Sequence, residues 1–122
     1  ICAPCPSDER LKKNVQPLHR ALNKILALRG VSFGWDEDIW ASRAKKDPQE
    51  IGLIAQEVEK VLPEVVREYE IIPDQNKPDE SMMIKGVKYE NIVALLIEGI
   101  KEQQEQINEL KATIEELKNG AA

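Results

Sequence analysis

Two side chains near the start of the chain have the types needed for nucleophilic chemistry, namely Ser7 and Lys12 in the stretch SDERLKKNV. A serine hydroxyl is a weak nucleophile unless a nearby base takes its proton, and a lysine amine is such a base only when it is neutral. Burial or neighbouring cations, here Arg10 and Lys13, lower the pKa of a lysine from about 10.4 toward neutrality. The residue types therefore allow a serine nucleophile with a lysine base.

The spacing of Ser7 and Lys12 does not establish such a pair. Residues five apart share a helical face less well than residues three or four apart. The two side chains meet only if Ser7 lies outside a helix and the chain bends back. The alternative is that Ser7 caps a short helical turn containing Glu9 and Arg10, with the lysines in solvent, and the residues alone favour this alternative.

The composition limits the kind of protein that can hold this stretch. The 122 residues are enough for one domain, and 42% of them are hydrophobic. Because 32% are charged and only 4% aromatic, we expect a small aliphatic core that is completed by association of several copies. The net charge of −5 argues against a nucleic-acid partner. No run is long enough to span a membrane and no phosphate-binding loop is present, so we expect neither a membrane partner nor a cofactor.

Residues 1–6, ICAPCP, hold both cysteines and two prolines and are interpreted as a linker. Cys2 and Cys5 have the C-x-x-C spacing of a redox couple or of half a zinc site. No second cysteine pair follows and His19 is distant, so we expect no metal site and a flexible tail that carries two thiols. Because the chain begins at Ile1, we expect a piece of a longer polypeptide without a signal peptide.

The next part of the chain predicts short helices and strands. An apolar face that includes Leu22 and Ile25 predicts a helix from about 17 to 28, which Gly30 ends. Alternating apolar residues predict a strand over 31–35, and the polar stretch 37–50 is predicted to be a loop anchored by Trp40.

A second helix and a hairpin are predicted before residue 90. A helical stripe over 54–62 is stopped by Pro63. Strands over 64–72 and 81–89 flank a turn-rich segment, and this hairpin either docks or projects as an arm. Gln56 and Glu57 are expected to make polar contacts between subunits, or else to support the SDERLKKNV stretch.

From about Tyr89 the sequence predicts one long helix with a heptad repeat. Positions a and d hold Val93, Leu96, Ile100, Gln103, Ile107, Leu110, Ile114 and Leu117. Because this stripe is narrow and its surroundings are charged, a coiled coil is favoured over a helix that packs on its own domain. Isoleucine at a with leucine at d favours two strands, and the polar Gln103 helps to set the register. The coil by itself leaves the number of chains open.

Four stretches in order resemble the C-terminal intramolecular chaperone domains of phage tail spikes and fibres, the peptidase S74 family. They are SDERLKKNV, ALNKILALRGVSFGW, GLIAQEVEKVLPEVV and GVKYENIVALLIEGIKEQQEQINELK, and the likeness covers about residues 7–117. The first stretch matches the opening pattern S-D-x-R-x-K-x-N of the family. The same module also occurs in membrane-tethered transcription factors, so the parent protein stays open.

The resemblance implies an α+β fold, with short helices and a β-hairpin arm packed at the base of a long C-terminal helix that forms a homotrimeric coiled coil. The implied divisions are 1–6 as the end of an upstream fibre segment, 7–90 as the chaperone and autoprotease domain, 91–118 as the coiled-coil helix, and 119–122 as a disordered tail. Such a domain holds three copies in register while the upstream stalk or β-helix of the same polypeptide folds.

The resemblance also implies that the domain then cuts itself off. Ser7 corresponds to the nucleophile, Lys12 to the general base and Pro6–Ser7 to the scissile bond, with backbone N–H groups near Leu11 as oxyanion donors. The other fixed positions of the motif, expected to orient the turn, are Asp8, Arg10 and Asn14. Release is expected in the host cytoplasm during virion assembly, which leaves the cut domain out of the mature virion.

Three other functions stay open at this point. The domain is alternatively a structural trimerisation cap that never cuts, the same module in a membrane-tethered transcription factor, or a coiled-coil adaptor for other proteins. The trimerisation cap forms the trimer but does not cleave itself. The transcription-factor module differs in the segment that precedes Ile1.

Overall fold

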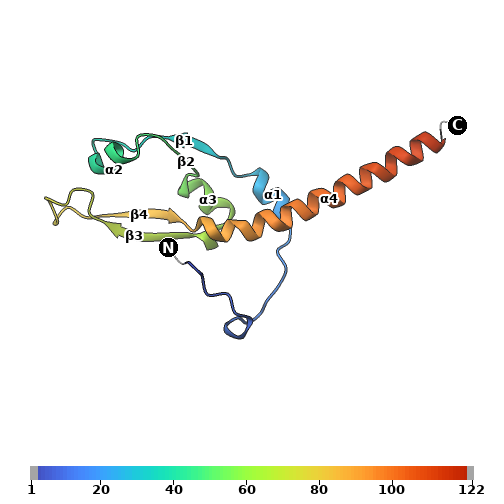
Figure 1. The fold of residues 1–122 in the computed structure, drawn as a ribbon, viewed down its shortest axis with the longest axis horizontal. Helices are drawn as coiled ribbons and strands as arrows, with labels where there is room; N and C mark the ends of the chain where they lie inside the picture. The colour runs from blue at the N-terminus through green and yellow to red at the C-terminus, as the bar shows by residue number, and fades with distance from the viewer. Residues whose placement is uncertain (1–2, 121–122) are drawn as a thin grey trace.

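The computed structural model of the chain describes residues 3–120, with short helices and strands at one end of a single long helix (Figure 1). Position 2 and the end of the expected tail, 121–122, lie outside the described residues. The elements are the 3-10 helices η1 (Glu9–Leu11) and η2 (Pro63–Val65), the helices α1 (Ala21–Leu26), α2 (Ala41–Lys46), α3 (Ala55–Val61) and α4 (Tyr89–Gly120), and the strands β1 (Val31–Phe33), β2 (Glu50–Gly52), β3 (Val66–Ile71) and β4 (Met82–Val87). The strands form two antiparallel pairs, β1–β2 and β3–β4. This arrangement confirms the predicted α+β class with a long C-terminal helix.

Residues 3–20 form an arm that stands away from the rest of the chain (Figure 1). Every one of these residues is exposed, including His19. Asn14 and Arg20 have φ values of 55° and 56°, in the left-handed region that residues other than glycine rarely adopt. Asn14 lies beyond η1 and Arg20 just before α1, so each sharp change of direction lies at the edge of a short element.

Helix α1 is shorter than predicted, because it begins at Ala21 rather than near residue 17. Arg20, with its left-handed backbone, cannot belong to a right-handed helix. The first turn is completed from α4, where the carboxylate of Glu102 accepts a hydrogen bond from the N–H of Leu22 at 2.6 Å. A contact between residues 80 apart thus sets the start of α1. Local periodicity carries no signal for such a contact.

The segment 37–50, predicted to be a loop, instead contains α2 and the first residue of β2, so that prediction was wrong. Its order comes from stacking of side chains. The ring of Trp40 lies 5.4 Å from that of Trp35, and the guanidinium of Arg43 lies 4.8 Å above the Trp35 ring. Trp40 is therefore an anchor as predicted, but it anchors a helix.

The core lies where α1, α3, η2, the base of the hairpin and the start of α4 meet. The buried residues are Ala21, Ala55, Val58, Leu62, Val65, Val66, Ile92 and Leu95. Val58 and Leu62 of the predicted helical stripe are only 1% and 4% exposed, and Pro63 ends that helix as expected. In the hairpin, Val66 is buried at the base whereas residues 67–70 are exposed. The hairpin therefore docks by its base and projects beyond it.

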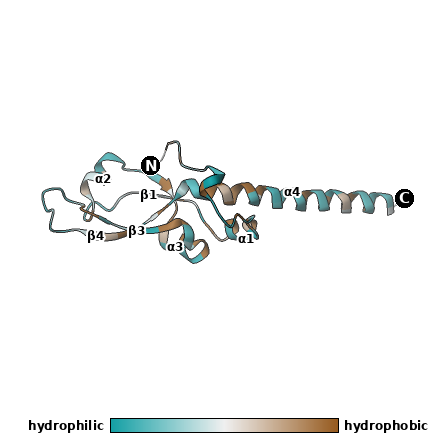
Figure 2. Ribbon diagram, turned by 90° about the horizontal axis from the view of Figure 1, so that it is seen from below, coloured by the Kyte–Doolittle hydropathy of each residue, from teal (hydrophilic) through white to brown (hydrophobic). Residues whose placement is uncertain are grey.

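Helix α4 begins at Tyr89 as predicted and continues through Gly120, so positions 119 and 120 of the expected tail are helical. Residues 100–119 contain neither glycine nor proline, and nothing in them stops the helix. Its 32 residues span about 48 Å. Only the first part lies on the body, and Figure 2 shows that the strongly hydrophobic turns of α4 are concentrated there.

Candidate functional site

Ser7 and Lys12 lie together in the arm. The Nζ atom of Lys12 donates a hydrogen bond to the Oγ atom of Ser7, at 2.8 Å. The short turn η1 lies between the two residues and bends the chain back on itself. Ser7 lies outside this turn, so a spacing that suits an α-helix poorly here gives direct contact.

The turn between them is capped by Asp8 and not by Ser7, contrary to the capping alternative. The Oδ1 atom of Asp8 accepts hydrogen bonds from the backbone N–H and the Nε of Arg10, at 2.9 and 3.1 Å, and Oδ2 lies 2.9 Å from Nη2. The hydrogen bonds from Arg10 lower the pKa of Asp8, and the carboxylate raises the pKa of Arg10. Because Asp8 does the capping, the hydroxyl of Ser7 is left to Lys12.

The same contacts change two roles expected from the sequence. The guanidinium of Arg10 is bonded to the carboxylate of Asp8 and is not directed at Lys12. The N–H of Leu11 donates to the carbonyl of Asp8 at 3.0 Å, and so it is not a free oxyanion donor in this conformation. Arg10 and Asp8 hold the turn through their mutual hydrogen bonds, and the left-handed Asn14 redirects the chain after it.

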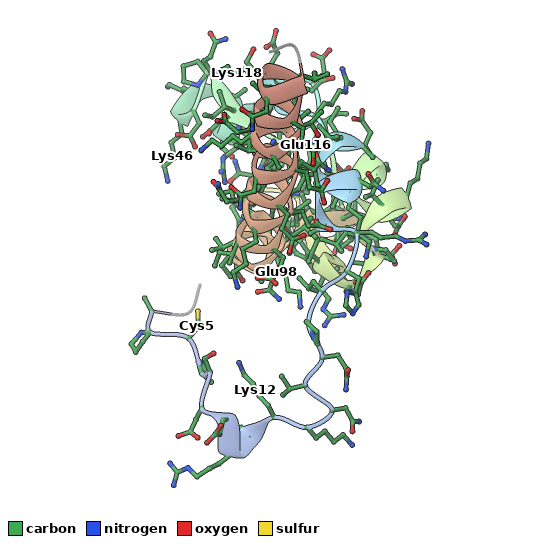
Figure 3. The ribbon with its side chains drawn as sticks, turned by 90° about the vertical axis from the view of Figure 1, so that its right-hand side faces the viewer. Cys5, Lys12, Lys46, Glu98, Glu116 and Lys118 are labelled. Atoms are coloured by element: carbon green, nitrogen blue, oxygen red, sulfur yellow. The ribbon has the colours of Figure 1, made fainter. Side chains whose placement is uncertain are left out.

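The pair is open to water. All residues from 3 to 20 are exposed, and Figure 3 shows Lys12 on the arm, apart from helix α4. A lysine amine that accepts the proton of Ser7 must be neutral, and removal of water favours the neutral form of an amine. The arm thus supplies the geometry of a nucleophile and base without the dry surroundings that make the base work.

The segment before Ser7 differs from one expectation. Cys5 is disulfide-bonded and is therefore not a free thiol, whereas Cys2 lies outside the described residues. No group of three or more histidine, cysteine, aspartate or glutamate side chains gathers to hold a metal ion in the range 3–120. None of the helices in that range has the length and hydropathy of a membrane span.

The heptad stripe of α4 is a second candidate surface. Its apolar members run from 44% exposed at Leu96 to 68% at Leu117, and Gln103 is exposed as well. The body contacts a different face of the helix, where Ile92, Leu95 and Gly99 are buried. An exposed apolar stripe of this length is typical of a surface that associates with another chain. Helix α4 therefore packs on its own domain through one face, and the heptad stripe on a different face stays exposed.

Two structural contacts were not anticipated. Glu57, expected between subunits, forms hydrogen bonds with Arg29 of its own chain through both carboxylate oxygens, each at 2.8 Å. The Arg29 guanidinium lowers the pKa of Glu57. Glu102, which caps α1, was not singled out at all. No local pattern marks either contact, because each joins residues far apart in the sequence.

Comparison with known proteins gave matches over most of the chain. The model of the peptidase S74 family, described as the chaperone of endosialidase, matches residues 7–67. The long tail fiber protein Gp37 of Enterobacteria phage K3 is 33% identical over 108 residues, which are 88% of this chain and 8% of that protein. The Gp37 proteins of Salmonella phage S16 and Enterobacteria phage M1 are also 33% identical, over 93% and 88% of this chain and 14% and 39% of theirs. The chain thus spans well under two thirds of each relative.

Proposed function

The chain belongs to the peptidase S74 family, the chaperones of endosialidase, and from this we propose that it is an intramolecular chaperone that assembles a phage fibre and then detaches from it. Its relatives are named long tail fiber proteins, which supports a fibre as the parent. In this proposal three copies associate through α4 and hold their upstream segments in register while these fold. Assembly and release take place in the host cytoplasm.

The observation that carries the proposal is the 2.8 Å contact between Lys12 Nζ and Ser7 Oγ. With Lys12 neutral, Ser7 Oγ attacks the carbonyl carbon of Pro6 while Lys12 takes the hydroxyl proton. The Pro6–Ser7 amide bond breaks, and Lys12 returns the proton to the amine of Ser7. Water then hydrolyses the ester, which leaves a carboxylate on Pro6 and restores the hydroxyl of Ser7.

Association supplies what the single chain lacks. In one chain the arm is exposed throughout, and nothing removes water from Lys12. Association of three α4 helices along the heptad stripe places three arms and three packed cores around one axis. When an arm packs in this assembly, water is removed from the amine of Lys12. Self-cleavage therefore follows assembly. The expected mass by light scattering is three times the 13.8 kDa of the chain.

A second candidate, a trimerisation cap that does not cut, is favoured by the exposure of the arm and by the proline before Ser7. The ring of Pro6 restricts its backbone and resists the geometry that attack on its carbonyl requires. This candidate shares the α4 assembly with the first one and differs only in the fate of the Pro6–Ser7 bond.

The experiment is an intact-mass measurement on a longer chain that carries its native upstream segment. We expect cleavage before Ser7, and its loss in Ser7→Ala and Lys12→Ala. Lys12→Arg should also be inactive, because arginine stays charged and cannot act as the base. The matched control is Lys46→Ala, which removes an exposed lysine of α2, outside the arm, and should cut normally. A trimer that stays whole establishes the non-cutting cap, and cleavage that persists in Lys12→Ala refutes the assigned base.

A further inference from the structure

All five aromatic residues of the chain line one cavity of about 480 Å³. It lies among β1, α2, the start of α3, the β3–β4 hairpin and the start of α4. The five rings are those of Phe33, Trp35, Trp40, Tyr69 and Tyr89. The buried core contains none of them. An aromatic-lined concavity of this size is typical of a binding site.

Anchoring of α2 explains only part of this cluster. Phe33, Trp35 and Trp40 pack edge to face, with ring centroids 5.1 and 5.4 Å apart. Tyr69 and Tyr89 are outside that stack and are 49% and 48% exposed. The Tyr69 ring lies against Gly86, and the Tyr89 hydroxyl accepts a hydrogen bond from the N–H of Leu53 at 2.9 Å, but the exposed part of each residue stays available to a ligand.

The charges around the cavity have one sign. Arg43, Arg67, Lys85 and Lys88 line it, and no aspartate or glutamate does, although the chain has a net charge of −5. Two of these cations are matched by carboxylates outside the lining. Arg43 Nε lies 3.0 Å from Asp47, and Lys85 donates to Glu59 at 2.5 Å.

The other two cations are available. Within residues 3–120, Arg67 and Lys88 form no ion pair. Arg67 lies on the same face of the hairpin as Tyr69, since residues two apart on a strand share a face. The cavity therefore keeps an uncompensated positive charge beside exposed aromatic rings.

One polar atom in the lining needs an acceptor. The indole N–H of Trp35 is buried and has no hydrogen-bond partner among the described residues. Buried polar groups nearly always have a partner. Both sheets around the cavity have only two strands, so their outer edges also offer backbone groups to an extended peptide.

We propose that this cavity binds an acidic peptide segment of another protein, with aspartate or glutamate side chains on Arg67 and Lys88 and apolar side chains against the tyrosine rings. A peptide fits better than a nucleic acid, which needs a longer run of cations than these two. The site is separate from the arm with Ser7 and Lys12. Its occupancy does not depend on the proposed self-cleavage.

The test starts from a random heptapeptide library selected on the chain. We expect enrichment of sequences that combine aspartate or glutamate with apolar residues. The strongest synthetic peptide is then titrated while tryptophan fluorescence is followed, because both tryptophans of the chain line the cavity. The Ser7→Ala variant should bind it equally well, so a failure of self-cleavage leaves this result untouched.

The decisive comparison uses two double variants with the same change in net charge. Arg67→Glu with Lys88→Glu should weaken binding at least about tenfold, because two charge-assisted contacts are reversed. Lys45→Glu with Lys46→Glu, on α2 outside the cavity lining, should bind within about twofold of the unaltered chain. Circular dichroism checks that both are folded.

Three results would overturn the proposal. One is a library without acidic enrichment. Another is equal weakening in the two double variants, which indicates a general charge effect. The third is tryptophan emission that shifts on self-association alone, with no peptide bound, because a second copy then covers the cavity.

Discussion

The arm, residues 3–20, joins the packed core at Ala21. The arm and this core, which lies at the base of α4, are stabilised in opposite ways. Contacts in the arm are local, since Arg10 reaches Asp8 two residues away and Lys12 reaches Ser7 five residues away. Contacts at the base join distant parts of the chain, as between Glu102 and Leu22. The arm has no buried residue, whereas the base holds the core.

The contact between Ser7 and Lys12 and the exposure of this proposed dyad to water therefore have separate causes. The short turn between Ser7 and Lys12 brings the hydroxyl and the amine together without help from the rest of the chain. Removal of water from the amine needs surface from elsewhere, and the single chain provides none. Perturbing the arm, the base and the coil should therefore have different consequences.

The largest expected effect comes from the coil. Ile107→Asp with Ile114→Asp places charges in the heptad stripe and should abolish both association and self-cleavage, because buried unpaired charges are strongly disfavoured. Light scattering and intact mass of the longer chain measure the two losses. The matched control is Ala112→Asp, which adds a charge on the opposite face and should associate and cut normally. Self-cleavage by the monomeric double variant would show that the arm needs no partner.

A smaller effect is expected within the base. Leu95 is 1% exposed, and Leu95→Ala should lower the free energy of unfolding by about 3 kcal/mol through lost burial and a cavity. Leu11 in the arm is 76% exposed, and Leu11→Ala should change the free energy by less than about 0.5 kcal/mol. Urea denaturation measures both. A comparable loss at Leu11 would mean that the arm packs on the body in solution.

The close approach of α1 to α4 should give a third effect. A Cβ atom at Gly99 would overlap the Cδ1 atom of Ile25. Gly99→Ala should thus destabilise the chain by about 1 kcal/mol, as overpacking outweighs the gain in helix propensity. Adding Ile25→Val removes the overlapping atom and should recover most of that loss. Gly30→Ala, which meets open space, is the control in the same urea experiment.

The smallest effect concerns the turn in the arm. Arg10 lowers the pKa of Asp8, so the stability that this carboxylate contributes is present above its ordinary value of 3.8 and is lost as the pH falls through the lowered value. Arg10→Gln should raise the pKa of Asp8 toward 3.8, measured from the Asp8 carboxyl signal by NMR. Arg20→Gln, also in the arm, should leave it unchanged. Global stability should barely respond, because both side chains are exposed.

Patterns of neighbouring residues predicted the elements that depend mainly on contacts between residues close in sequence. The turn-rich segment between two strand-like stretches predicted β3 and β4, and the heptad repeat predicted α4 from Tyr89. The pattern also identified Ser7 and Lys12 as the two groups with chemistry, although their spacing argued against contact. It did not identify the cap, because Ser7 and Asp8 both have suitable side chains, and the bidentate contact with Arg10 selects Asp8.

Residue types and periodicity by themselves predicted the long helix and the hairpin, because each depends on neighbours along the chain. Only the tertiary structure decided that 41–46 is a helix, that α1 begins at Ala21, and that the five aromatic rings meet in one cavity. Those outcomes depend on contacts such as Trp35 with Trp40 and Glu102 with Leu22. The contact of Glu102 with Leu22 exists only once distant segments are packed together. The contact of Trp35 with Trp40 joins near neighbours, but it depends on how the rings are placed, which the periodicity of the sequence does not give.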